Sequence, residues 1–134
     1  MIHRSRQKVY NKYNGKCAYC GQEIDMKDMQ IDHVICKKNF LMHIKNKWKI
    51  PKFLSHLTED DVNHHDNLFP TCRICNNWKS TFDVESFRSE IAIQIERLKM
   101  YNPNYRLACR YGLINETNVP ILFHFEKELE NGTT

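Results

Sequence analysis

The chain has 134 residues, which suits one domain with a single hydrophobic core. Hydrophobic residues make up 41% and charged residues 27%, as in ordinary globular proteins, and no apolar run approaches the roughly 18 residues of a membrane span. The basic start, MIHRSRQKVY, lacks the apolar segment of a secretory signal, so we expect a cytoplasmic protein with no membrane partner.

The net charge of +4 is unevenly distributed along the chain. Residues 1–52 contain 12 Lys and Arg against 4 Asp and Glu, whereas residues 53–134 contain 8 against 12. A basic half favours a polyanionic partner such as nucleic acid. A solvated, lysine-rich surface would give the same counts, so charge alone leaves both interpretations open.

The first predicted element is a short basic helix over residues 4–13, which Asn14 and Gly15 would end. Two cysteine pairs follow, CAYC at 17–20 and CRIC at 72–75. Disulfides are rare in a reducing cytosol, so these pairs predict a closed, structural zinc site with four thiolate ligands. The ligands are Cys17, Cys20, Cys72 and Cys75. Four unrelated cysteines, or a thioredoxin-like redox pair, are the alternatives.

The stretch MQIDHVIC at 29–36 has the β-branched residues of a buried strand, yet it places Asp32 and His33 side by side. Neighbouring side chains of a strand point to opposite faces. Residues 37–66 then form a long connection whose first part is basic and aromatic. This connection either contacts a phosphate backbone or packs Phe40 and Trp48 onto the core.

The remaining elements predict an α+β fold. Residues 67–72 read as a short extended piece, and a short helix follows from Cys75. Residues 83–101 predict a long helix with one apolar stripe, and residues 105–112 predict two further helical turns. The alternating sequence VPILFHF at 119–125 predicts a strand. We expect the two unpaired cysteines, Cys36 and Cys109, to be core residues.

The order of CAYC, IDHV, DNLFPTC and CRICNNWKS resembles the HNH endonuclease family, the ββα-metal or His-Me finger nucleases. The resemblance covers residues 16–82, and the flanking segments are similar to those of small phage or prophage HNH proteins. It implies one nuclease domain over 1–134 with a zinc-stapled ββα-metal core, an N-terminal helix, and C-terminal helices plus a strand. Residues 37–66 would be an insertion and residues 83–130 an extension.

The resemblance also implies a role for each polar residue of the motif. His33 would be the general base that activates water, and Asp32 and Asn76 would hold a catalytic Mg²⁺ or Mn²⁺, since oxygen ligands suit hard cations. Asn67 would orient His33, and Asn rather than His at position 76 makes this an H-N-N variant. Phosphate contacts would come from Lys79, Lys37 and Lys38.

Metal-dependent hydrolysis of DNA phosphodiester bonds is therefore the expected function, with 5′-phosphate and 3′-hydroxyl products. RNA is the alternative substrate. A monomer would nick, whereas a homodimer could cut both strands. The setting would be the cytoplasm of a bacterium or a phage-infected host. A non-catalytic zinc-stabilised nucleic-acid-binding module and a phage-encoded interaction protein are the rival functions.

Each assigned residue also has a purely structural interpretation. His33 could bond only to backbone, and Asp32 could form only a surface ion pair. Asn67 could cap a turn, Asn76 could cap the following helix, and Lys79 could be a solvated surface lysine.

Overall fold

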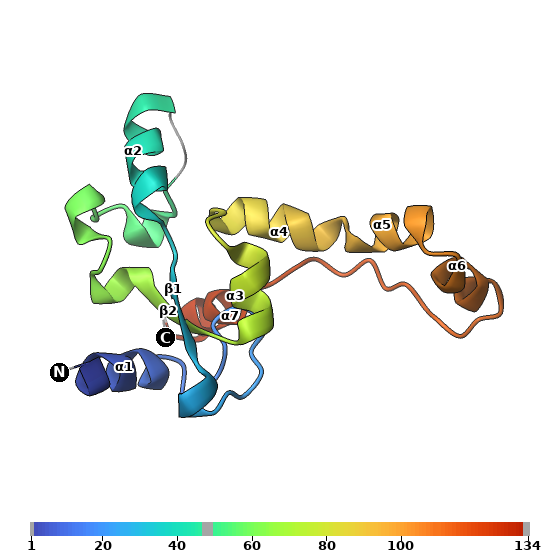
Figure 1. Cartoon of the computed structure of the whole chain (residues 1–134), viewed down its shortest axis with the longest axis horizontal. Helices are drawn as coiled ribbons and strands as arrows, with labels where there is room; N and C mark the ends of the chain where they lie inside the picture. Colours follow the sequence, from blue (N-terminus) through green and yellow to red (C-terminus); the bar gives the residue numbers. More distant parts are fainter. Residues whose placement is uncertain (1, 47–49, 133–134) are drawn as a thin grey trace. The chain divides into compact units, whose positions relative to one another are not determined.

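The computed structural model describes residues 2–46 and 50–132, with side chains over 5–41 and 50–129. The chain divides into two compact units, one formed by Met1–Val84 with Leu122–Thr134 and the other by Glu85–Ile121. Helices and a small two-stranded sheet confirm the α+β class (Figure 1). No helix within these described ranges is both long and apolar enough to cross a membrane.

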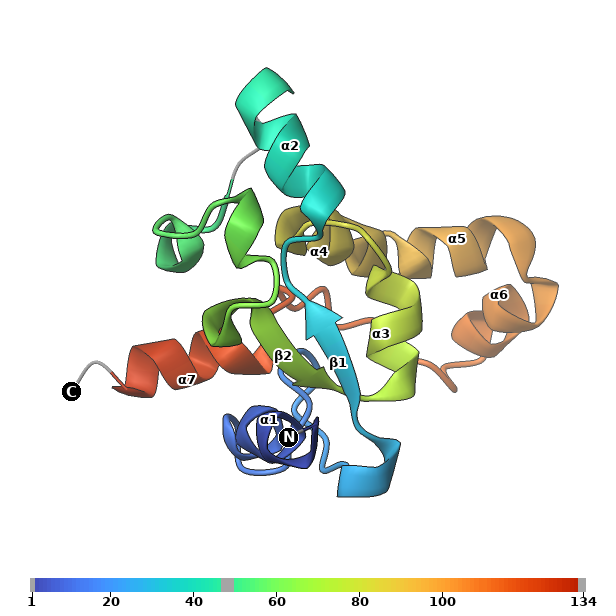
Figure 2. The ribbon, with the colours of Figure 1, turned by 60° about the vertical axis from the view of Figure 1, so that its left-hand side comes forward.

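A short antiparallel sheet forms the centre of the first unit. Strand β1 (Gln30–His33) pairs with β2 (Leu68–Thr71), and the register places Asp32 opposite Phe69. Helix α3 (Arg73–Lys79) begins directly after β2 and packs beside β1, while α1 (Ile2–Asn11) contacts β2 (Figure 2). The chain order β1, β2, α3 therefore brings the predicted motif residues together around one sheet.

Aromatic side chains fill the core beside β2. Phe69 packs with its ring centroid 4.9 Å from that of Phe125, and the ring of Tyr19 lies 5.1 Å from that of Phe123. All four side chains are buried. Because Phe123 and Phe125 come from the C-terminal segment, the end of the chain completes the core of the first unit.

The strand predicted over residues 119–125 is wrong. Within the described residues this segment pairs with no strand, and helix α7 (His124–Gly132) begins inside it. The backbone N–H groups of His124 and Phe125 donate instead to the carbonyls of Tyr19 and Ala18, at 3.0 and 2.8 Å. The alternating aromatics thus pack against a cysteine-bearing turn rather than joining a sheet.

The connection between the strands contains short helices. Helix α2 (Lys37–Asn46) is followed by the 3₁₀ turns η2 (Lys52–Leu54), η3 (Glu59–Asp61) and η4 (His65–Asn67). Phe40 is buried, in agreement with the packing interpretation, whereas Trp48 lies outside the described residues.

The predicted helix over 83–101 is broken into two. Helix α4 (Val84–Ala92) ends before Ile93, whose φ of −90° and ψ of 0° interrupt the helix, and α5 (Gln94–Tyr101) follows. The apolar stripe is correspondingly divided, because Phe87 on α4 is 2% exposed whereas Leu98 on α5 is 36% exposed. Burial of the second half was not predictable from its spacing.

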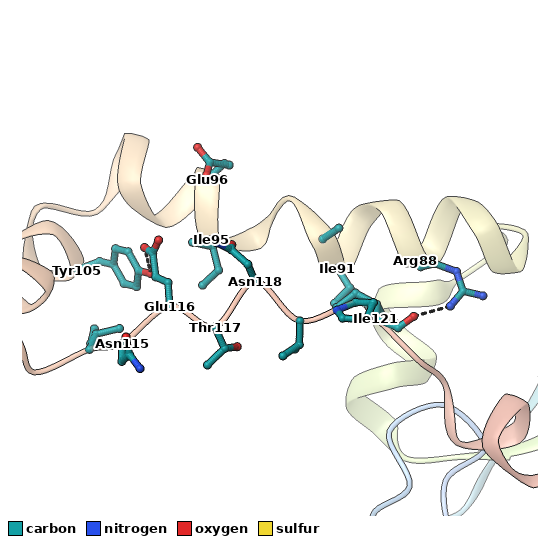
Figure 3. Close-up of a pocket in the computed structure, with 14 residues that line it drawn as sticks. Arg88, Ile91, Ile95, Glu96, Tyr105, Asn115, Glu116, Thr117, Asn118 and Ile121 are labelled. Atoms are coloured by element: carbon teal, nitrogen blue, oxygen red, sulfur yellow. Dashed lines mark hydrogen bonds between the residues drawn. The ribbon is translucent and has the colours of Figure 1, made fainter.

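Helix α6 (Pro103–Arg110) turns the chain back, and an extended segment over 113–121 runs beside α4 and α5 (Figure 3). Arg88 Nη1 donates to the Ile121 carbonyl at 2.6 Å, and the Tyr105 hydroxyl donates to Glu116 at 2.7 Å. A groove of about 450 Å³ lies between the segment and the two helices. These contacts hold the second unit together without a sheet.

Candidate metal centre and active site

Four thiols converge at one point in the first unit. The sulfurs of Cys17, Cys20, Cys72 and Cys75 all lie within 4.8 Å of one another, and Cys20 Sγ is 3.8 Å from Cys72 Sγ. A tetrahedral zinc ion with Zn–S bonds of about 2.3 Å would separate its sulfurs by roughly 3.8 Å. The predicted four-cysteine cluster is therefore confirmed, and its donors and spacing fit structural zinc.

Each cysteine pair is presented by a local backbone structure. Gly21, at φ 78°, lets its N–H return to the Cys17 carbonyl at 2.9 Å, in a conformation that a side chain would strain. In the second pair, Cys72 is the N-cap of α3, and its sulfur accepts the Cys75 N–H at 3.4 Å. Local turns thus present both cysteine pairs to one point in the first unit.

The thiols favour a cation on electrostatic grounds. A hydrogen bond from Cys75 lowers the pKa of Cys17 to about 5, whereas burial raises the pKa of Cys20 to about 11. Donation to Cys17 also raises the pKa of Cys75. A bound divalent cation would offset the repulsion between neighbouring thiolates.

Asp32 is held by two buried side chains. Its Oδ2 accepts the Tyr19 hydroxyl at 2.6 Å, and its Oδ1 lies 3.2 Å from the Lys79 ammonium. Burial raises the pKa of Asp32, while Lys79 and Tyr19 act in the opposite direction. An ionised carboxylate has about four acceptor positions, so these two contacts leave others for a cation.

Lys79 does not occupy the phosphate-contacting position that the sequence predicts. Its side chain is fully buried, and its ammonium also donates to the His33 carbonyl at 3.2 Å. A lysine three residues beyond Asn76 does lie on the same side of the helix. However, the ion pair with Asp32 draws it into the protein and away from solvent.

His33, Asp32 and Asn76 line one open cavity of about 380 Å³, together with Cys36 and residues at the end of α3. The imidazole of His33 is half-exposed, and its Nε2 lies 2.9 Å from Asn63 Oδ1. Cys36, expected in the core, is half-buried at this cavity instead. The predicted base and both predicted oxygen ligands therefore line the same cavity.

Asn76 lies within α3, whose N-cap is Cys72, so the helix-cap interpretation of Asn76 does not apply. Its side chain is half-buried and makes no hydrogen bond to any residue that the structure describes. Its amide oxygen is consequently available to a ligand in the cavity.

Asn67 ties the backbone of two loops together from a fully buried position. Its Oδ1 accepts the Ile35 N–H, and its Nδ2 donates to the carbonyls of Ile35 and Val62, each at 2.9 Å. The first loop follows His33 and the second precedes Asn63. This is more than a turn cap, because it fixes the chain on both sides of the imidazole.

The predicted phosphate contacts Lys37 and Lys38 lie in the first turn of α2 with exposed side chains. They follow Cys36, which lines the cavity, so they border the site without entering it. Their positive charge remains available to a polyanion.

Comparison of this chain with protein-family models, curated proteins and solved structures gives no match.

Two residues of the site could not be assigned from the sequence, Tyr19 and Asn63. Tyr19 lies between two cysteines of the four-cysteine cluster, where its most evident role is in the turn. Asn63 lies in the long connection, thirty residues beyond the imidazole that it contacts. Neither residue has a position in the sequence that indicates its contact. Only the tertiary structure brings Tyr19 to Asp32 and Asn63 to His33.

Proposed function

We propose that this protein is a metal-dependent endonuclease with a ββα-metal core, built on a zinc-stapled sheet and acting on DNA. The observation that supports the proposal is the shared cavity, which is lined by His33, Asp32 and Asn76, the last of which has a side-chain amide with no hydrogen bond among the described residues. These are the groups needed for a general base and for a hard cation bound through oxygen.

In this proposal Asp32 and Asn76 would hold Mg²⁺ or Mn²⁺, and the ion would supply positive charge beside the scissile phosphate. His33 accepts a proton from water, and the resulting hydroxide attacks phosphorus. The bond from phosphorus to the 3′-oxygen breaks, and that oxygen takes a proton from solvent. The products are a 5′-phosphate and a 3′-hydroxyl, with the proton on His33 returned to solvent.

One observation favours a rival function. Asp32 already has a buried ammonium and a buried hydroxyl as partners, which is the pattern of a structural ion pair. A zinc-stabilised module that binds nucleic acid without cutting it would need no metal at Asp32. The exposed Lys37 and Lys38 would serve such a module equally well.

Cleavage of supercoiled plasmid in Mg²⁺ or Mn²⁺ separates the two functions. We expect the parent to nick the plasmid and His33→Ala to lose activity, while the control His65→Ala, altered at an exposed loop histidine, keeps it. Asn76→Ala should reduce cleavage at least roughly 10-fold with the fold intact, because its amide makes no hydrogen bond to any other described residue. Plasmid binding without cleavage by the parent would establish the rival function.

A further inference from the structure

We propose that Asn63 is a positioning residue that fixes the tautomer of His33, so that Nδ1 is the nitrogen that accepts the proton. The inference deepens the proposed nuclease function and rests on His33 being its general base. The 37–66 insertion would then have a role in the site, because it supplies the hydrogen-bond partner of the general base.

The contact itself defines the tautomer. Asn63 Oδ1 lies 2.9 Å from His33 Nε2, and a carbonyl oxygen can only accept a hydrogen bond. Nε2 must then carry the proton of the neutral ring. The other nitrogen, Nδ1, is left with its lone pair, which is the form that a general base requires.

Asn63 is held in place through its neighbour. Asn67 Nδ2 donates to the carbonyl of Val62 at 2.9 Å, and the same amide group bonds to both backbone groups of Ile35. Asn67 is fully buried, so water does not compete for these bonds. One side chain thereby links the loop beyond His33 to the residue just before Asn63.

Backbone hydrogen bonds of the 3₁₀ turns before and after Asn63 also stabilise this segment. Asp61 Oδ2 accepts the backbone N–H of Thr58 at 2.8 Å, and the Asp61 carbonyl accepts the N–H of His64 at 2.8 Å. The His64 carbonyl accepts the N–H of Asn67 at 2.8 Å. Asn63 is therefore presented from a segment whose backbone is bonded before and after it, although its own side chain is exposed.

The first test is the ¹⁵N spectrum of histidine-labelled, zinc-loaded full chain above the pKa of the imidazole, with His33→Ala identifying the His33 signals. We expect a protonated Nε2 and an unprotonated Nδ1 in the parent, and averaged tautomers in Asn63→Ala. A protonated Nδ1 in the parent, which a reversed Asn63 amide would produce, overturns the proposal. So does an Asn63→Ala spectrum identical to that of the parent.

The second test is the pH profile of cleavage. Asn63→Asp puts a carboxylate beside Nε2, which stabilises the imidazolium, so the acid limb should move to higher pH by about one unit. Asn63→Ala should lower kcat about 10-fold with KM unchanged. The matched controls Asn104→Ala and Asn104→Asp alter an exposed asparagine without hydrogen bonds among the described residues and should change neither measurement.

The two proposals fail in distinguishable ways. Loss of cleavage in His33→Ala with an unchanged Asn63→Ala spectrum and pH profile overturns the role of Asn63 alone. A parent that cuts no nucleic acid, yet shows the expected tautomer and loses it in Asn63→Ala, overturns the nuclease function and supports the contact.

Discussion

Replacing Lys79 with methionine should destabilise the protein by about 3–5 kcal/mol, the usual effect of removing one partner of a buried ion pair. The ammonium is 0% exposed and its carboxylate partner, Asp32, is 3% exposed, so solvent does not weaken the pair. Methionine retains the apolar stem but loses hydrogen bonds to Asp32 and to the His33 carbonyl. Each bond to a charged group contributes roughly 1.5–3 kcal/mol, which agrees with that total.

The assay is urea unfolding of zinc-loaded protein followed by circular dichroism at a fixed excess of zinc. With an m value of about 2 kcal/mol/M, the midpoint should fall by roughly 2 M. The control Lys127→Met changes an exposed lysine and should stay within about 0.5 kcal/mol of the parent. A Lys79→Met protein within about 1 kcal/mol of the parent would refute the buried ion pair.

The double variant Asp32→Asn, Lys79→Met should be more stable than Lys79→Met alone, because it removes the uncompensated carboxylate. The charge of the Asp32 carboxylate also makes the stability of Lys79→Met depend on pH. Burial raises the pKa of Asp32 in the folded protein, so protonation of this carboxyl group favours folding. Its contribution to the free energy of unfolding is lost as the pH rises through the folded-state pKa. The deficit of Lys79→Met against the double variant should therefore shrink as the pH falls. Both proteins share the zinc site, so zinc loss cancels in this comparison.

Three further outcomes are expected. Chelating zinc should unfold the first unit, because binding and folding free energies are shared in small metal sites, and an unchanged circular dichroism spectrum of zinc-free protein would contradict this. Tyr19→Phe should cost about 1–3 kcal/mol in urea unfolding, because the buried carboxylate of Asp32 loses a donor, whereas a neutral effect would show that water replaces the hydroxyl. Asn67→Ala should lower the free energy of unfolding more than Tyr19→Phe does, because three backbone groups of Ile35 and Val62 lose their hydrogen-bond partner. Equal stability of the two variants would argue against a role for the Asn67 side chain in joining the two loops.

Local spacing was sufficient to predict the cysteine cluster and the short elements around it. Each C-x-x-C pair is arranged by its own turn, so Cys17 and Cys72 could be assigned without knowledge of the rest of the chain. The strand carrying Asp32 and His33 was likewise predictable, since β-branched residues surround them. Its observed extent, Gln30–His33, is shorter than the predicted strand, because the chain turns at Val34.

Several other interactions between distant residues were not predictable. Lys79 was placed on the correct side of its helix, but its burial depends on Asp32, which lies 47 positions earlier in the chain. The alternating residues before α7 satisfy a strand pattern equally well, and only their contact with the Tyr19 turn excludes the strand. Periodicity also carries no information about Ile93, where the helix breaks.

The sequence positions of the two units have a practical consequence. Glu85–Ile121 interrupts the chain of the first unit, which resumes with Phe123 and Phe125 in its core. Truncation before Phe123 would remove the rings of Phe123 and Phe125 from that core, so the first unit depends on residues that follow the second. The first unit is therefore assembled from two separate stretches of chain, and its core is complete only with residues that follow the second unit.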